Sequence, residues 1–234
     1  MDVVPMAVAA GFGVLIGPGL AGLTLRIPVS EPCWPAGWWH GAGVGRRRLS
    51  VVTAASMVSL GLAGAGIGFA GALPAYLWFG AIAVVLTVID VEHHRLPNRL
   101  TYPSYPAGLL LLGAASLAGH AGQAYLRALL TMVALLTASL LVAVISPTAL
   151  GLGDVKLTGL LGLYLGWLGT GFVLLGIGFG VLVGAAMAVG LLATGRAGLH
   201  SEIAYGPPLL VGGMVSVGFG GPLLDAYLAM AGLR

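Results

Sequence analysis

Two aspartates in an otherwise apolar sequence are the residues best suited to do chemistry. Asp154 lies in the stretch GLGDVK at 151–156 and is the only acidic residue between Glu92 and Glu202, while Asp90 directly follows a long apolar run. Two carboxyl groups held close together cannot both ionise easily, so one can serve as a base while the other serves as an acid. Such a pair could activate a water molecule and protonate a leaving amine without a metal ion or a nucleophilic serine.

The residues around Asp154 fit both a structural and a functional interpretation. Gly151 and Gly153 leave the backbone bare beside the carboxylate, so that another chain could approach closely. Lys156 could balance the negative charge of the region. The same residues are also common in a loop that joins two helices, with Asp154 capping the second helix. This stretch alone leaves both interpretations open.

The composition is that of an integral membrane protein. Hydrophobic residues make up 59% of the 234 positions and charged residues only 7%, whereas about a quarter of the residues in a soluble domain are charged. Long apolar runs separated by short polar joints exclude a β-barrel and predict an all-α transmembrane bundle. We expect a single domain over residues 1–234, with the N-terminal run retained as a membrane helix because no basic residues precede it.

The apolar runs predict eight helices, most of them of the length that crosses a membrane, about 17 to 25 residues. The sixth is short and rich in glycine, so the pattern leaves open whether it crosses completely. The expected segments are 3–25, 51–71, 74–90, 103–119, 124–146, 152–168, 170–194 and 207–231.

The basic residues predict how the helices are oriented. If the N-terminus lies outside, eight of the ten lysines and arginines fall on the inner side, and only Arg127 and Arg234 fall outside. This distribution agrees with the rule that cytoplasmic loops carry the positive charge. Asp90 and Asp154 would then share the inner face.

The loop 26–50 has a composition suited to contact with lipid. It contains three tryptophans and the arginine run 46–48, which favour the membrane interface and anionic head groups. Its only candidate zinc ligands are Cys33 and His40, too few for a closed site. No phosphate-binding loop stands elsewhere in the sequence. We therefore expect no cofactor, no metal and no nucleic-acid partner.

The region 90–103 is a concentrated polar stretch in an otherwise apolar chain. An ordinary solvent-facing loop explains Glu92, His93 and Arg95, because Pro97 would stop a helix there. Asp90 is different, since an ionisable group at the edge of an apolar segment usually has a function.

These motifs, taken in order, resemble the type IV prepilin peptidase family of membrane aspartic proteases. They are Asp90 followed by Leu96-Pro97-Asn98, LTYP at 100–103, GLGDVKL at 151–157 and AYGPP at 204–208. The region 17–28, which begins Gly-Pro-Gly-Leu, also resembles the first helix of the family and its exit.

The resemblance implies that Asp90 and Asp154 form a catalytic pair. The substrate would be a pilin-like or pseudopilin precursor with a short basic leader, cut after a glycine at the cytoplasmic side of the bacterial inner membrane. Whether a pilus, a secretion system or a competence system is served stays open. The residues expected to bind substrate or shape the site are Gly151, Gly153, Lys156, Pro97, Asn98, Tyr205, Gly206, Pro207, Glu92 and Glu202. Because Glu92 and Glu202 are the remaining acids expected near the site on the inner side, we predict that one or the other helps to hold the basic leader.

Two other classes of protein remain possible. In a small transporter or proton channel, Asp90 and Asp154 would relay ions, as intramembrane acids often do. Such proteins commonly contain an internal repeat, and no convincing repeat is present. An inactive assembly scaffold is the third class, although both aspartates are present.

The sequence departs from the family at the loop 26–50. Many members carry two CxxC pairs there and methylate the new N-terminus from S-adenosylmethionine, whereas this loop has Cys33 alone. Asn98 also stands where aspartate is frequent. We expect purified protein to contain no stoichiometric zinc, to cleave in the presence of a chelator and to leave the product unmethylated. A methyl mass increment on the product would contradict this prediction.

Overall fold

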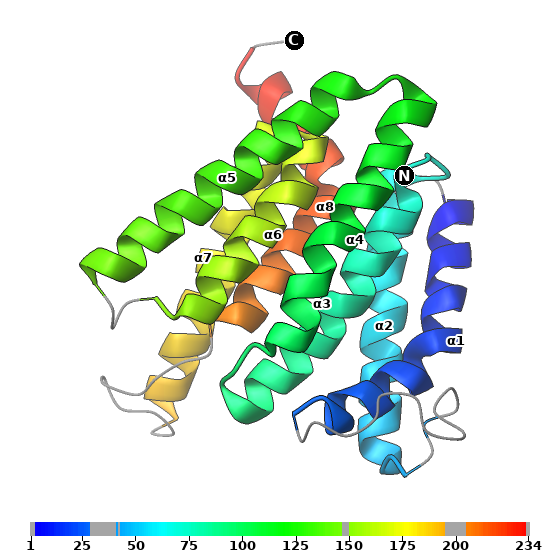
Figure 1. Ribbon diagram of the computed structural model, residues 1–234, viewed down its shortest axis with the longest axis vertical. Helices are drawn as coiled ribbons and strands as arrows, with labels where there is room; N and C mark the ends of the chain where they lie inside the picture. The colour runs from blue at the N-terminus through cyan, green and yellow to red at the C-terminus, as the bar shows by residue number, and fades with distance from the viewer. Residues whose placement is uncertain (1–2, 29–40, 42, 147–149, 195–204, 233–234) are drawn as a thin grey trace.

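The described part of the chain folds into a bundle of eight helices (Figure 1). The computed structural model describes residues 3–28, 41, 43–146, 150–194 and 205–232, and every regular element within them is helical. The prediction of an all-α bundle with eight helices is confirmed. The helices are α1 (Val3–Arg26), α2 (Arg46–Ile67), α3 (Leu73–His93), α4 (Asn98–Gly119), α5 (Gly122–Ile145), α6 (Leu152–Leu168), α7 (Thr170–Ala193) and α8 (Gly206–Met230).

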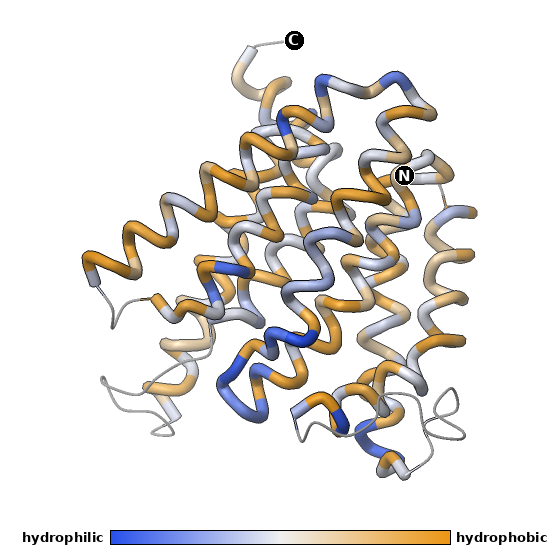
Figure 2. The backbone as a smooth tube through the Cα atoms, in the orientation of Figure 1, coloured by the Kyte–Doolittle hydropathy of each residue, from blue (hydrophilic) through white to orange (hydrophobic). Residues whose placement is uncertain are grey.

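The protein is a multi-pass membrane protein. Among the described residues, six helices are long and apolar enough to cross a membrane, and α4 and α6 are the two that do not meet both criteria. The tube in Figure 2 shows hydrophilic residues gathered at the ends of the bundle, most densely where α3 joins α4.

Two helices begin earlier than the apolar pattern predicted. Helix α2 starts at Arg46 rather than at residue 51, so its first turn contains the three arginines. Helix α4 starts at Asn98 rather than at residue 103. The carbonyl of Pro97 accepts the backbone N–H groups of Leu100 and Thr101 at 3.0 and 3.1 Å, so an extra turn forms ahead of the prolines. Pro103 and Pro106 therefore lie inside the helix, although proline is usually found in the first turn.

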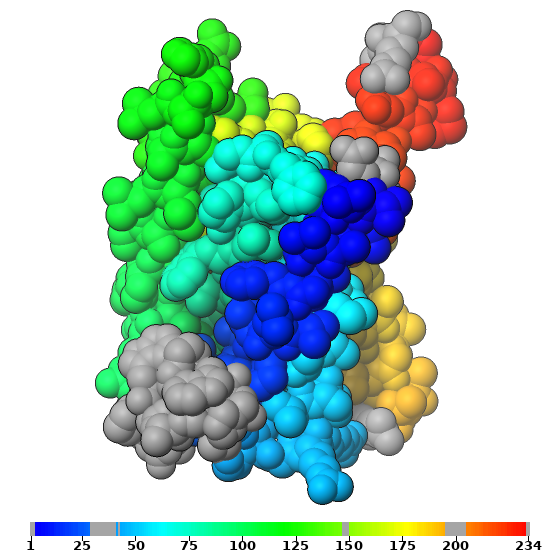
Figure 3. Space-filling model, turned by 90° about the vertical axis from the view of Figure 1, so that its right-hand side faces the viewer, coloured from blue at the N-terminus to red at the C-terminus, as the bar shows by residue number. Residues whose placement is uncertain are grey.

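The helices that carry the candidate site are the most enclosed. Most residues of α3, α6 and the first half of α8 are buried, whereas α5 and α7 leave most of their surface exposed on the outside of the bundle. Helix α1 packs mainly against α2 and lies across it in Figure 3. Both the central and the outer helices are apolar on every side, as core helices and membrane spans can be, so apolar composition alone does not explain why α3 is central and α5 and α7 are outside.

Buried tyrosines set the register of these central helices. The hydroxyl of Tyr76 on α3 donates to the backbone carbonyl of Tyr164 on α6 at 2.6 Å. The ring of Tyr164 stacks on Phe79 of α3, with 4.4 Å between ring centres. A buried hydroxyl without a partner would cost about 1 to 3 kcal/mol, so the bond favours one axial position of α3 against α6.

Helix α6 is the shortest of the eight helices in the described residues, with 17 residues. At 1.5 Å per residue it is about 25 Å long. Arg127, near the start of α5, donates to the carbonyls of Gly166 and Trp167 at 2.8 and 2.6 Å. The last carbonyls of a helix lack partners within it and favour a nearby cation. Helix α6 therefore ends where α5 begins, at the opposite end from Asp154.

Glycine allows α7 and α8 to pack with their backbones in contact. A Cβ atom added at Gly212 of α8 would collide with the carbonyl of Gly176 and the amide of Gly180 on α7. Small residues at helix interfaces permit this approach in membrane proteins. The two helices therefore pack as a unit.

Gly212→Ala should destabilise the protein by about 1 to 3 kcal/mol, because the added methyl group must push α7 and α8 apart. Gly178→Ala is the matched control, since nothing lies within 4 Å of a Cβ atom there. The control should be neutral or stabilising by about 0.5 to 1 kcal/mol, because alanine favours a helix interior. Thermal unfolding of both variants in detergent measures the difference, and equal midpoints would contradict the close packing.

Candidate active site

Asp90 and Asp154 come together at the first residue of α8. Asp90 lies in the last turn of α3, and Asp154 lies in the first turn of α6. A Cβ atom added at Gly206 would lie 2.5 Å from Oδ2 of Asp90 and 3.6 Å from Oδ1 of Asp154. The two carboxyl groups therefore flank the backbone of Gly206, and the missing side chain leaves room for both.

Asp90 is buried, with only 5% of its surface exposed. Its Oδ2 atom has no hydrogen-bond partner within the described part of the chain, while the backbone amide of Gly206 lies beside the carboxyl group. Pro207 and Pro208 follow Gly206 and have no N–H groups. The Gly206 amide is therefore the donor that the start of α8 offers to an anion, and a helix N-terminus favours negative charge.

The two oxygens of Asp154 face different partners. Oδ2 lies toward Gly151, the N-cap residue of α6, and the Gly151 amide interacts with the carboxylate. Asp154 is the third residue of α6, the position from which an acidic side chain reaches back to the N-cap amide. The capping interpretation therefore accounts for one of the two carboxylate oxygens. Oδ1 faces Gly206 and Asp90. The negative charges of Asp154 and Asp90 are close enough to repel each other.

Tyr205 also lies near Asp154. It is the N-cap residue of α8, and its ring packs against Gly184 of α7, where an added Cβ atom would lie 3.0 Å from the ring. Partial burial, followed by the nearby charge of Asp154, raises the pKa of the Tyr205 phenol. The phenol therefore keeps its proton and remains a hydrogen-bond donor at neutral pH.

Lys156 joins α6 to α4. Its Nζ atom donates to Oδ1 of Asn98 at 2.9 Å and lies 4.8 Å from the ring centre of Tyr102. The hydroxyl of Tyr105 donates to the Lys156 carbonyl at 2.5 Å. The lysine thus contacts residues of the α4 start, and the cation–π contact and hydrogen bond hold that turn against the first turn of α6.

Gly153 and Pro97 belong to the same contact between α4 and α6. A Cβ atom at Gly153 would lie 3.3 Å from the Cβ atom of Leu96, so the connection between α3 and α4 rests on the bare backbone of α6. Pro97 is the N-cap residue of α4 at this point. These residues hold the start of α4 against the first turn of α6, which carries Asp154.

Glu92 takes part in a different interaction. Its Oε1 atom pairs with Arg48 of α2 at 2.6 Å, and Arg48 also donates to the hydroxyl of Thr24 on α1 at 3.0 Å. This network links the first three helices at the end of the bundle that holds the site. Several sequence-predicted residues lie outside the described residues, namely Glu202, Ala204, Cys33, His40 and the loop tryptophans.

His94 is a neighbour of Asp90 that the sequence interpretation did not single out. It ends α3 with a left-handed backbone at φ 49°, and its amide donates to the Asp90 carbonyl at 2.8 Å. Its side chain is close enough to act electrostatically on the Asp90 carboxyl. The sequence did contain a signal for His94. It is a histidine one turn after Asp90 and three residues before Pro97, and helices usually end before a proline.

Comparison with known proteins matches residues 77–194 to the type IV leader peptidase family. This segment contains both aspartates. Among curated relatives, the prepilin leader peptidase/N-methyltransferase of Aeromonas hydrophila is 33% identical over 155 residues, which cover 63% of this chain and 50% of the relative. The protein of the same name from Xanthomonas campestris pv. campestris is 36% identical over 164 residues, covering 67% and 55%.

The relative of that name from Pseudomonas aeruginosa is matched over a longer stretch. It is 30% identical over 203 residues, which cover 82% of this chain and 65% of the relative. The chain spans about half the length of the first curated relatives it matches. No solved structure matches the chain.

The contact between Leu96 and Gly153 predicts a disulfide. In a Cys33→Ala background, Leu96→Cys combined with Gly153→Cys should cross-link on mild oxidation, because a small relaxation brings the two Cβ atoms into the usual range of about 3.5 to 4.5 Å. Leu96→Cys with Gly151→Cys is the control, since a Cβ atom at Gly151 meets only Asp154 within 4 Å. Mass spectrometry of the digested proteins detects the linked peptides. Cross-linking of the control pair alone would contradict the described register.

Proposed function

Because this chain belongs to the type IV leader peptidase family, we propose that it is a membrane aspartic endopeptidase that removes the basic leader from prepilin-like precursors. One observation carries the proposal: two carboxyl groups from separate helices, Asp90 and Asp154, flank the same glycine at one end of the bundle. Their neighbours include an amide donor and a protonated phenol but no cation in an ion pair with either carboxylate among the described residues.

The paired carboxyl groups hydrolyse a peptide bond by sharing one proton. The ionised carboxylate accepts a proton from a water molecule while the water oxygen bonds to the scissile carbonyl carbon. The protonated carboxyl group donates its proton to the nitrogen of the leaving amine as the carbon–nitrogen bond breaks. The products are a leader with a new carboxyl terminus and a mature chain with a new amino terminus. The roles belong to the pair, because strongly coupled groups titrate together.

The surroundings fit this chemistry. The unpartnered Oδ2 atom of Asp90 is available to a water or a substrate group. Gly206 gives a substrate backbone space beside the carboxyl groups, and its amide and the α8 N-terminus stabilise negative charge there. Tyr205 adds a phenol donor near Asp154.

Charge supports placing this site at the cytoplasmic face of a bacterial inner membrane. The described basic residues at the same end as Asp90 and Asp154 outnumber the single one, Arg127, near the opposite end, as the positive-inside rule expects. The residues are Arg26, Arg46, Arg47, Arg48, Arg95, Arg99 and Lys156.

The proposal includes a role for Glu92 or Glu202 in holding the basic leader. Glu92 is partly exposed and paired with Arg48, so a leader cation would have to compete with that arginine. An exposed ion pair contributes at most about 1 kcal/mol, which a flexible basic leader can exchange for its own contact. The proposal covers cleavage and not methyl transfer, because Cys33 is the only cysteine in the sequence.

No observation favours the alternative of a proton channel. Relay groups in a channel have to continue through the bundle, and the two aspartates lie at one end. Beyond them the space between α3 and α6 is filled by Tyr76, Phe79 and Tyr164, all at most 1% exposed. This packed aromatic layer interrupts a proton path between the two helices.

Asp90→Asn and Asp154→Asn should each reduce cleavage by about three orders of magnitude or more while the protein folds, because the volume is kept and the proton transfer is lost. Asp225→Asn is the control, since Asp225 lies in the last turns of α8, and it should cleave normally. Gly206→Ala should also lose most activity, because its Cβ atom would collide with the Asp90 carboxyl group. Mass spectrometry of a precursor incubated with each purified variant locates and quantifies the cut. Near-normal cleavage by either asparagine variant would refute the paired mechanism.

A further inference from the structure

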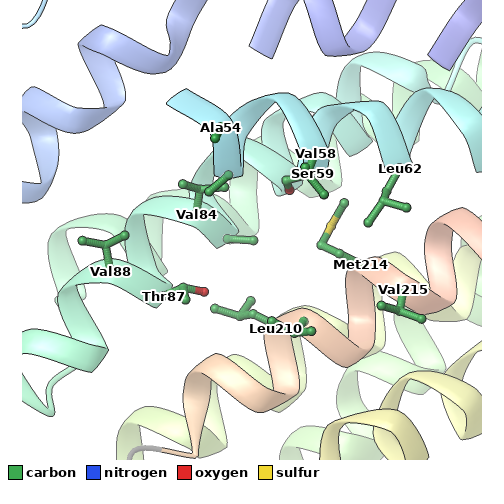
Figure 4. Close-up of a pocket in the computed structure, with 13 residues that line it drawn as sticks. Ala54, Val58, Ser59, Leu62, Val84, Thr87, Val88, Leu210, Met214 and Val215 are labelled. Carbon is green, nitrogen blue, oxygen red and sulfur yellow. The ribbon is translucent and has the colours of Figure 1, made fainter. Parts of the chain in front are cut away.

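An apolar cavity of about 450 Å³ lies between α2, α3 and α8 (Figure 4). Figure 4 shows Val84, Thr87 and Val88 of α3 opposite Leu210 and Met214 of α8, with α2 closing the third side. Ser59 is one of its few polar lining residues, and its hydroxyl is already used in a 3.0 Å bond to the Gly80 carbonyl. The cavity therefore suits a hydrocarbon group rather than a polar ligand.

The cavity is lined by residues that lie close in sequence to Asp90 on α3 and to Gly206 on α8. On α3, Thr87 precedes Asp90 by three residues and Ala83 precedes it by seven, so these two lining residues share a helix face with the aspartate, while Val84 and Val88 line the cavity from the adjacent face. On α8, Leu210 and Met214 follow Gly206 at four-residue intervals on one face. The same two helix faces thus line the cavity and, one turn later, meet at the carboxyl groups.

The cavity has a buried floor and an accessible rim. Val84 and Met214 are 6% and 5% exposed, whereas Val58 of α2 and Val211 of α8 are 57% and 43% exposed. At 1.5 Å per residue, the α3 residues that line the cavity lie between about 3 Å and about 10 Å from Asp90 along the helix axis. A group bound here would be covered on three sides and open toward the lipid.

We propose that this cavity binds the first apolar side chains that follow the scissile bond of the substrate, an inference that rests on the proposed function. A substrate with an apolar helix after its leader would place that helix along the rim, with its first large side chains between α3 and α8. The peptide bond just before the helix would then lie one turn away, beside Asp90 and Gly206. The cavity selects substrates whose leader is followed at once by bulky apolar residues.

A lipid acyl chain is the competing occupant. It has similar chemistry, but a lipid needs no carboxyl pair at the end of its binding site. The shared helix faces of the cavity and the pair favour the substrate. The two occupants predict different results, because only the substrate couples the cavity to the sequence after the scissile bond.

Val211→Trp tests the proposal by filling the rim of the cavity. The control is Val181→Trp on α7, because Val181 is similarly exposed at 48% and does not line the cavity. Two synthetic precursors serve as probes, each with a lysine-rich leader, a glycine and about 20 apolar residues. The first has leucine at the four positions after the scissile bond, and the second has alanine there. We measure kcat/KM of wild-type protein and both variants on both probes.

The proposal predicts that Val211→Trp lowers kcat/KM at least tenfold on the leucine probe, since losing the space for even one methylene group changes discrimination by about that factor. On the alanine probe the loss should be less than about twofold, and Val181→Trp should leave both values unchanged. An equal effect on both probes, or none on either, would overturn the proposal and favour a lipid occupant. If wild-type protein cleaves neither probe, the proposed function itself fails.

Cross-linking gives a readout that does not depend on turnover. Val211→Cys in a background of Cys33→Ala and Asp154→Asn should form a disulfide with a cysteine placed at one of the first positions after the scissile bond. The matched Val181→Cys protein should form none. Absence of a cross-link from Val211 at all four positions would overturn the assigned location.

Discussion

This structure depends on one constraint, which is the burial of a carboxyl group at the end of an apolar helix. Burying an ionised carboxylate is expensive unless other groups compensate for the lost water. Asp90 is 5% exposed, and the described residues supply it with the Gly206 amide, the positive end of α8 and the nearby His94, but no paired cation. A second carboxylate, that of Asp154, lies nearby, and repulsion between the two negative charges increases the free-energy cost of burial. Proteins keep such arrangements where chemistry needs them.

The rest of the bundle can be understood as the means of holding these groups in position. Asp90, Asp154 and Gly206 belong to three helices, so their separation depends on the axial register of each helix. The Tyr76 hydroxyl fixes α3 against α6, and the Tyr105 hydroxyl and Lys156 fix α4 against α6. Each is a polar group that is satisfied in one register only. Apolar packing alone would resist sliding less strongly, because dispersion contacts are individually small.

The sequence predicted the parts of this arrangement that depend on composition and order along the chain. Apolar runs located eight helices, and the scarcity of acids drew attention to Asp90 and Asp154. The predicted start of α4 was wrong, because the Pro97 carbonyl accepts hydrogen bonds that support an additional helical turn. An apolar pattern does not reveal such a turn. Glu92 pairs with Arg48, 44 residues away, and the rotation of each helix decides such a partner. In apolar helices like α3 and α6, periodicity does not reveal that rotation, so the contact between Tyr76 and Tyr164 could not be foreseen.

The way the helices pair also has a mechanical consequence. Arg127 ties α5 to the far end of α6, and the backbones of α7 and α8 touch at Gly212. Each pair should therefore move as a rigid body, with Asp154 carried by one and Gly206 carried by the other. Thermal sliding between closely packed helices takes the form of small shear displacements. Such shear between the two pairs, rather than rotation of a side chain, would change the separation between Asp154 and Gly206 while Asp90 stays on α3.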